Sequence, residues 1–231
     1  IIGNIERLLM LTLYWPNWVY NLLINPISKF ILQLIGIVDI PKPKKLKQDQ
    51  FNNIQNTSFI SWKNIDKLNI KQNSIILTPD IFTYFFRSKL IVDYCKVLSH
   101  LNYKIILTPP LKTGKPLHIK GFLKAFKKEA KKTSKQLKRL EKLKCPILSI
   151  DPAMTLTYRD EYASFLKRED LVHVQLFQEW AQTQPFIRKE ETKTAYLLGH
   201  CSEKTLIYNS SDLWISIFKK CGITLNSIES G

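Results

Sequence analysis

Apolar and polar residues follow two different periods through the middle of the chain. Short apolar runs at 74–78, 103–108 and 146–150 each end at a proline-containing turn, a pattern that is typical of buried strands. Between them, residues 89–101 and 119–140 place apolar side chains every three or four positions, as an amphipathic helix does. The pattern therefore predicts strands and helices in alternation.

The alternation continues towards the end of the chain. It predicts a helix over 171–181, a strand over 194–198, a helix over 212–220 and a strand over 223–228. Strands that alternate with helices form a parallel sheet with helices packed on its faces, so the predicted fold class is α/β. Ligands of such sheets bind beyond the carboxyl ends of the strands. Those ends carry polar residues here, at Thr78-Pro79-Asp80, Thr108-Pro109-Pro110, Asp151-Pro152 and Gly199-His200-Cys201.

The first 56 residues have a different character. No charged residue occurs from Leu8 to Ser28, but Pro16 and Pro26 interrupt this run, so short packed helices are favoured over a membrane span. Contact with a membrane surface is the residual alternative for this segment. The predicted organisation is a helical segment at 1–40, a loop at 41–56 rich in Lys, Gln, Asn and Pro, and one α/β domain at 57–231.

The chain is strongly basic, with 35 Lys and Arg against 19 Asp and Glu and a net charge of +16. Such a charge favours polyanionic partners, although Lys, Asn and Ile recur throughout, which indicates a general compositional bias. The lysines of 120–144 lie opposite an apolar stripe, as on a solvated helix face, and no aromatic ladder or helix-turn-helix spacing accompanies them. A basic module that binds nucleic acid or an anionic membrane is therefore the second hypothesis.

Four cysteines, Cys95, Cys145, Cys201 and Cys221, are widely spaced. They form no C-x-x-C pair, so the sequence predicts neither a disulfide framework nor a complete zinc site, and a reducing cytoplasm is the expected compartment. The chain begins at Ile1 without an initiator Met or a signal peptide, which suggests a piece of a longer protein.

Three segments contain candidate chemistry. Residues 114–121, Gly-Lys-Pro-Leu-His-Ile-Lys-Gly, could present amides and lysines to an anion, although an ordinary loop with a helix start is the favoured interpretation. Residues 151–162 read most simply as a helix capped by Asp151 with an Arg159–Glu161 surface pair. Residues 199–205, Gly-His-Cys-Ser-Glu-Lys-Thr, place a thiol after a predicted strand, where Lys204 and a helix amino terminus would favour the thiolate form. On spacing alone, a lone buried cysteine is the commoner case.

Together, these three segments resemble the large bacterial FAD-linked oxidases of the D-2-hydroxyglutarate dehydrogenase type. The resemblance implies a flavin module followed by a ferredoxin-like module and a closing CCG-type iron–sulfur domain similar to that of heterodisulfide reductase subunits. By this resemblance, the chain would correspond to the linker after the ferredoxin-like module and most of the CCG-type domain. The whole protein would oxidise a D-2-hydroxy acid, D-2-hydroxyglutarate or D-lactate, and pass electrons to an acceptor. It would be cytoplasmic or peripheral to the inner membrane.

The resemblance also assigns roles to particular residues. Cys201 matches the single cysteine that precedes the Cys-Cys-Gly of a CCG-type domain and is the expected ligand of a 4Fe-4S type cluster, whose remaining ligands would follow Gly231. His118, His200 and Lys204 are expected to tune that cluster through hydrogen bonds and charge. The other three cysteines are assigned to packing. FAD would bind to the flavin module, because this segment has no dinucleotide fingerprint.

Overall fold

The computed structural model describes most of the chain. The described residues are 2–12, 19, 21–22, 25–34, 46–68, 70, 73–186, 193–199, 201–207 and 209–228.

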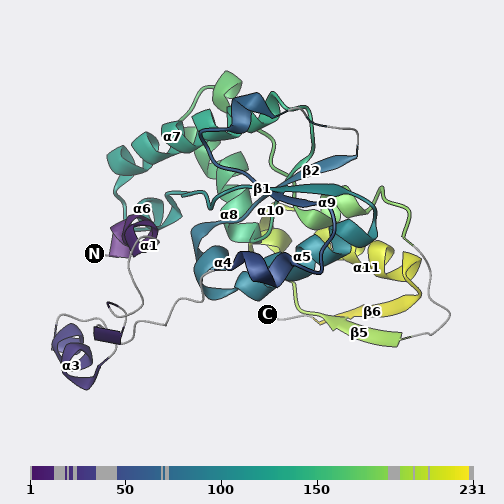
Figure 1. The fold of residues 1–231 in the computed structure, drawn as a ribbon, viewed down its shortest axis with the longest axis horizontal. Coiled ribbons are helices and arrows are strands. Elements are labelled where there is room, and N and C mark those ends of the chain that lie inside the picture. The colour runs from purple at the N-terminus through teal and green to yellow at the C-terminus, as the bar shows by residue number, and fades with distance from the viewer. Residues whose placement is uncertain are drawn as a thin grey trace.

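The centre of the molecule is a four-stranded parallel sheet (Figure 1). Its strands are β1 (Thr57–Phe59), β2 (Ser74–Thr78), β3 (Lys104–Leu107) and β4 (Ile147–Ser149), in the order β1-β3-β2-β4. The three strands predicted from the apolar runs are confirmed. β1 was not predicted, because only three residues pair with β3 and they are not a buried apolar run.

Both faces of this sheet are covered, and this explains why its strands are continuous apolar runs. One set of side chains, including Ile75, Leu77 and Leu107, packs with α5 (Ser88–His100) and α9 (Phe177–Ala181). The alternate set, including Ile76 and Ile106, packs with α7 (Leu123–Glu141). The α/β class with a parallel, helix-flanked sheet is therefore confirmed.

Two predicted helices differ from the structure in extent. The helix expected from residue 119 is interrupted at Gly121, whose φ of +74° separates α6 (Lys115–Ile119) from α7. The helix expected over 171–181 comprises only α9, because the preceding residues are extended and Gln175 pairs with Leu148 at the edge of the sheet. A short helix that was not predicted, α4 (Ile81–Phe86), follows β2.

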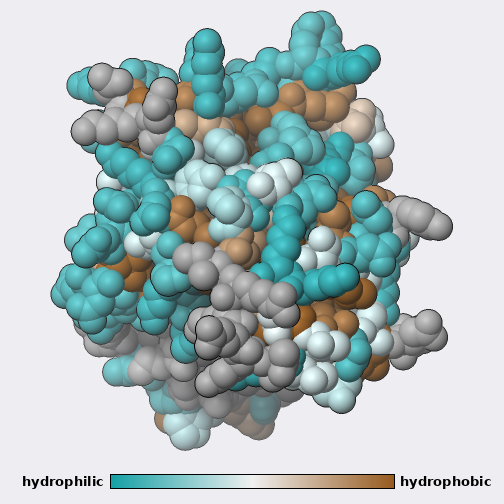
Figure 2. Space-filling model, turned by 90° about the vertical axis from the view of Figure 1, so that its right-hand side faces the viewer, coloured by the Kyte–Doolittle hydropathy of each residue, from teal (hydrophilic) through white to brown (hydrophobic). Residues whose placement is uncertain are grey.

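The last predicted strands do not join the main sheet. β5 (Lys193–Leu197) and β6 (Ile223–Ser227) form a separate two-stranded parallel sheet, covered by α11 (Ser210–Lys220). The expectation of one continuous sheet was wrong, since β5 pairs only with β6 among the described strands. On the side of the molecule where this second sheet lies, Figure 2 shows mostly hydrophilic side chains with small, separate hydrophobic patches.

Before the sheet, the chain forms α1 (Ile5–Thr12) and α3 (Pro26–Leu34), and α3 lies apart from the domain in Figure 1. No described helix is both long enough and apolar enough to cross a membrane. Of the expected loop at 41–56, residues 46–56 are described. They include the 3-10 helix η2 (Gln48–Phe51), which buries Phe51 in the core.

Candidate functional site at the carboxyl-end rim

The carboxyl ends of β2 and β4 form the centre of the candidate site. Thr78 of β2 pairs with Ser149 of β4, so Asp80 and Asp151 each lie two residues beyond a paired position. The chain leaves β2 for β3 on one side and reaches β4 on the other, which makes the β2–β4 junction the topological switch point of the sheet. Crevices at such points are the usual ligand sites of open α/β folds.

Asp80 is completely buried and caps α4. Its Oδ1 accepts hydrogen bonds from the amides of Phe82 at 2.8 Å and Thr83 at 3.0 Å, and its Oδ2 accepts one from the Thr83 hydroxyl at 2.5 Å. Burial raises the pKa of this carboxyl above its ordinary value. The hydrogen bonds from Thr83 oppose the rise, and the negative charge of Asp151 adds to it.

Asp151 caps the short helix α8 (Pro152–Leu156), as predicted. Its Oδ1 accepts a hydrogen bond from the Met154 amide at 3.0 Å. The predicted Arg159–Glu161 pair was wrong, because Arg159 forms its ion pair with Glu179 of α9 at 2.7 Å. Residues 157–161 form a single π-helical turn, which turns the two side chains towards different partners.

A third carboxylate reaches the same region from the amino-terminal helix. Glu6 of α1 is buried, and its Oε1 accepts hydrogen bonds from the Thr113 amide at 2.9 Å and hydroxyl at 2.8 Å. Its Oε2 accepts a hydrogen bond from the Gly114 amide at 2.8 Å. Burial raises the pKa of Glu6, although these three bonds favour the charged form. The segment 114–121 thus begins with a carboxylate-binding turn, which an acidic residue of the same chain occupies.

Lys115 and His118 meet at one acidic residue. Lys115 forms an ion pair with Glu161, and His118 Nδ1 lies 3.1 Å from the second oxygen of Glu161. The His118 ring also packs against Phe126 at a centroid distance of 4.7 Å and against Phe165 at 5.8 Å. These partners belong to α7 and the segment around the π-turn. These contacts hold the His118 ring between α6 and the π-turn. The role of His118 beside a cluster stays a prediction.

Cys201 is the first residue of α10 (Cys201–Leu206) and its side chain is exposed. Lys204 lies one helical turn later, so the two side chains share a face of α10. The Lys204 side chain also folds towards Gly199, where a Cβ would lie 3.1 Å from Lys204 Cε. His200, the third predicted residue of this segment, lies outside the described residues. Cys201 and Lys204 therefore lie on the same face of α10, and their role beside a cluster stays a prediction.

The helix that carries Cys201 is anchored to the rest of the domain from its opposite side. Glu203 is buried and accepts hydrogen bonds from Gln178 of α9 and from the Ser210 hydroxyl, the latter at 3.3 Å. α10 also packs against α8, the helix that Asp151 caps. Tyr94 lies close enough to both helices to be affected by their carboxylates. Burial raises the pKa of its hydroxyl, and the negative charges of Glu203 in α10 and Asp151 at the start of α8 raise it further. Through these contacts the Cys201 helix lies beside the rim of the main sheet.

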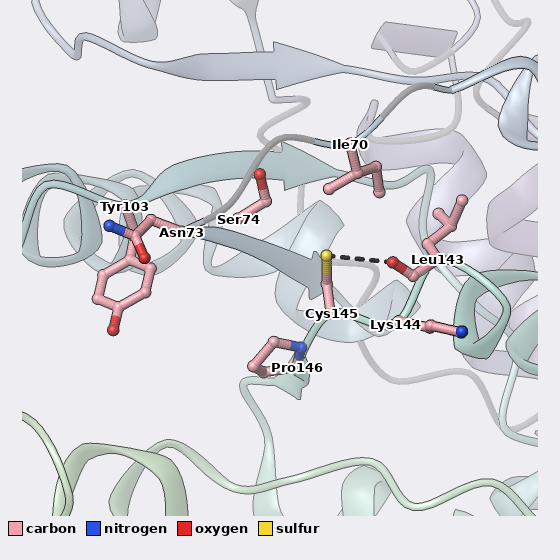
Figure 3. Close-up of a pocket in the computed structure, with 8 residues that line it drawn as sticks. All are labelled: Ile70, Asn73, Ser74, Tyr103, Leu143, Lys144, Cys145 and Pro146. Carbon is pink, nitrogen blue, oxygen red and sulfur yellow. Dashed lines mark hydrogen bonds between the residues drawn. The ribbon is translucent and has the colours of Figure 1, made fainter.

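The other three cysteines are less accessible. Cys95 lies in the core between α5 and the sheet, and burial raises the pKa of its thiol to about 12. Burial also raises the thiol pKa of Cys145 and Cys221, which are half-buried. Cys145 lines a pocket with residues including Asn73 and Tyr103 at the amino ends of the strands, and its thiol donates a hydrogen bond to the Leu143 carbonyl at 3.4 Å (Figure 3). That pocket is at the opposite end of the sheet from the rim.

Within the part of the chain that the structure describes, no three His, Cys, Asp or Glu side chains are grouped as a metal site would require. Cys201 therefore belongs to no such group within the described residues. Sequence reasoning missed Glu6, Gln178 and Glu203, which position α1 and the Cys201 helix. The sequence offered one indication that Glu6 is buried and bonded, because it is an acidic residue in a mostly apolar helix. Nothing local identified its partners, which are more than a hundred positions away.

The fold and the rim define an open α/β domain with a candidate site at its switch point. The chain is similar to D-2-hydroxyglutarate dehydrogenases, at 31% identity for the protein of Escherichia coli, over 92% of this chain and 22% of the relative. Identity is 30% for the Pseudomonas putida protein, over 100% of this chain and 23% of the relative. Identity is 34% for the Pantoea ananatis protein, over 85% of this chain and 20% of the relative. The chain spans about a fifth of the length of these curated relatives. No family model and no solved structure matches it.

Proposed function

We propose that this chain is the iron–sulfur electron-transfer region of an FAD-linked D-2-hydroxyacid dehydrogenase of the D-2-hydroxyglutarate or D-lactate type. The observation that carries the proposal is the similarity to D-2-hydroxyglutarate dehydrogenases along nearly the whole chain. In this proposal the partners of the region are FAD and ferredoxin-like modules of the same polypeptide and an electron acceptor.

Cys201 is the proposed cluster ligand. Its exposure at the first residue of a helix supports this role, since cluster ligands are thiolates and a helix amino terminus favours negative charge. Cys95 is a poor ligand by comparison, because its thiol is buried among apolar side chains and resists ionisation. Lys204, on the same helix face, would add positive charge near the cluster and so favour its reduced form.

The chemistry of the proposed enzyme divides between its cofactors and this chain. When bound, FAD would accept a hydride from the hydroxy acid, and a 4Fe-4S cluster would relay the two electrons one at a time. The residues of this chain would hold one iron through Cys201. They would also keep the ligand helix in place through Glu203, Gln178 and Ser210.

The test compares two cysteine variants of the longest polypeptide that the source encodes around this sequence. Cys201→Ser should lower iron and acid-labile sulfide per chain by the content of one cluster and remove the EPR signal of that cluster, while FAD content and the iron of the ferredoxin-like module stay unchanged. Cys221→Ser is the matched control, because Cys221 lies on the same half of the domain but is half-buried at the end of α11. Cys95→Ala should also leave iron content nearly unchanged.

D-2-hydroxyglutarate and D-lactate oxidation, measured with an artificial acceptor, completes the experiment. Activity with an acceptor that takes electrons from the flavin should survive Cys201→Ser, whereas activity that depends on the cluster should fall with the iron. Full iron occupancy after Cys201→Ser would exclude Cys201 as a ligand. Equal iron loss in all three variants would mean that the ligand was chosen wrongly.

A basic binding module is the second candidate function. It is favoured by the exposed lysines of α7, which lie opposite the buried stripe of Phe126, Ala130 and Leu137. Binding to DNA that weakens steeply with salt, in a full-length protein that contains no iron, would support this function over the first.

A further inference from the structure

Large apolar side chains are exposed where α6 ends and α7 begins. Ile119 is 68% exposed, Phe122 56% and Leu123 46%. Next to this junction, the 3-10 helix η1 (Ile2–Asn4) packs against α6, and α1 follows with Leu8 and Leu11 exposed on its surface. Figure 1 shows α1, α6 and the start of α7 together at one end of the molecule. Exposed apolar side chains that cluster in this way usually mark an interaction surface.

The backbone at the junction explains why these side chains point outward. Gly121 has a φ of +74° and nothing within 4 Å of the place where a Cβ would be, so it forms an open, protruding turn. The neighbours on either side are anchored, because Phe126 is fully buried in the core and Leu117 packs against it. Phe122 rests on the surface against Gly3, where a Cβ would lie 2.8 Å from Phe122 Cδ2. The turn is therefore held firmly while its apolar side chains face solvent.

The charged residues within the turn and the first part of α7 are all basic. No acidic residue occurs between Lys115 and Lys128, and Lys120, Lys124, Lys127 and Lys128 are exposed. Among the described residues none of these four lysines forms a salt bridge. Three acidic side chains that contact this part of the fold have partners of their own: Glu129 pairs with Lys112 at 2.6 Å, Glu161 pairs with Lys115, and Glu6 accepts a hydrogen bond from Thr113. We define the α6–α7 tip as Ile119, Lys120, Gly121, Phe122, Leu123, Lys124, Lys127 and Lys128.

We infer that the α6–α7 tip binds an anionic membrane surface. Apolar side chains surrounded by lysines, without acidic residues, match the boundary between acyl chains and anionic headgroups. Ile119, Phe122 and Leu123 insert at the level of the headgroups, and the lysines contact the lipid phosphates while their aliphatic stems cover the apolar centre. A nucleic acid would use the lysines but would leave two exposed aliphatic side chains without a partner. The inference stands independently of the proposed electron-transfer function.

Vesicle co-sedimentation of the 231-residue chain tests the inference. The vesicles are phosphatidylcholine alone or phosphatidylcholine with phosphatidylglycerol, and binding is expected only to the anionic vesicles and to weaken with salt. Phe122→Ser with Leu123→Ser should reduce the partition coefficient about tenfold, because the inserted apolar area is lost. The matched control, Leu90→Ser with Val97→Ser, removes two exposed apolar side chains of α5 and should bind as wild type.

A second pair of variants tests the charges. Lys124→Gln, Lys127→Gln and Lys128→Gln together should weaken binding by roughly a hundredfold, which corresponds to about 1 kcal/mol for each lysine near an anionic surface. The control is a second triple variant, Lys63→Gln with Lys67→Gln and Lys219→Gln. It lowers the net charge by the same amount at exposed positions elsewhere on the surface, and it should weaken vesicle binding much less. Equal loss in both triple variants would reduce the effect to net charge and overturn the inference. So would binding to DNA but not to vesicles, or a dimer that Phe122→Ser with Leu123→Ser dissolves.

Discussion

The main sheet and the β5–β6 sheet are both parallel, yet they are buried to very different extents. Every residue of β2 is buried, whereas β5 has no buried residue and β6 buries only Leu225. Helices cover both faces of the main sheet, while α11 covers the small one. Because buried apolar area is the main source of stability, the region with the candidate ligand Cys201 should open more readily than the region with the rim carboxylates.

The small sheet is stabilised mainly by contacts of its helices with the main domain. Ile217 of α11 lies in the core that α5 and α9 share, and Trp214 stacks on Phe177 at a centroid distance of 5.9 Å. The hydrogen bonds among Gln178, Glu203 and Ser210 join α9, α10 and the start of α11. A short sheet on the surface can therefore keep a defined position, and α10 with it.

The largest expected effect compares the same substitution in the two sheets. Leu107→Ala in β3 removes a fully buried side chain and should lower the free energy of unfolding by about 3–5 kcal/mol. Leu225→Ala in β6 should cost about 2 kcal/mol or less, because β6 is covered on one side and can relax. Urea denaturation followed by circular dichroism measures both. An equal loss of free energy of unfolding in the two variants would show that the two sheets are equally well packed and unfold together.

The second effect concerns the buried cap at the rim. Asp80→Ala should lower the free energy of unfolding by about 1–2 kcal/mol, since two amides and the Thr83 hydroxyl lose their partner. Asp80→Asn keeps the oxygen that both amides use and should cost much less. Asp151→Ala, at the half-exposed cap of the neighbouring strand, is the control and should cost less than Asp80→Ala.

The pH dependence sharpens this comparison. The pKa of Asp80 is raised by folding above its ordinary 3.8, so its stabilising contribution is complete below that pH and is lost as the pH rises through the folded value. Asp80→Asn removes this loss. The stability of Asp80→Asn relative to wild type should therefore increase as the pH rises above about 4. An advantage of the variant that grows instead as the pH falls would contradict the raised pKa.

The smallest effect is a local one. Ser210→Ala removes a hydroxyl that is hydrogen-bonded to Gln178 at 3.0 Å and to Glu203, and should destabilise the β5–β6 region by about 1 kcal/mol. Amide hydrogen exchange should show faster exchange in β5 and β6 with little change in β2 and β3. Ser211→Ala, at the half-buried neighbouring position, is the control. Uniform acceleration across both sheets would refute local unfolding.

Parts of the candidate site were predictable because they depend on nearby residues. Asp151 as a helix cap follows from an acid at a strand end before Pro152, and the bond to Met154 spans three residues. The helix start after Gly114 and the solvated lysine face of α7 are local in the same way. The ion pair of Arg159 with Glu179 was not predictable, because a π-turn and the packing of α9 choose the partner.

The sequence by itself determined the α/β class, strands β2, β3 and β4 and helix α5, because hydrophobic period and turn residues act over a few neighbouring positions. Tertiary structure alone decided which strands pair, and so placed β5 and β6 in their own sheet. It also brought Glu6 to Thr113 and Glu203 to Gln178. These contacts join residues far apart in the chain, and their free energy comes from burial and hydrogen bonds that exist only once the elements have packed.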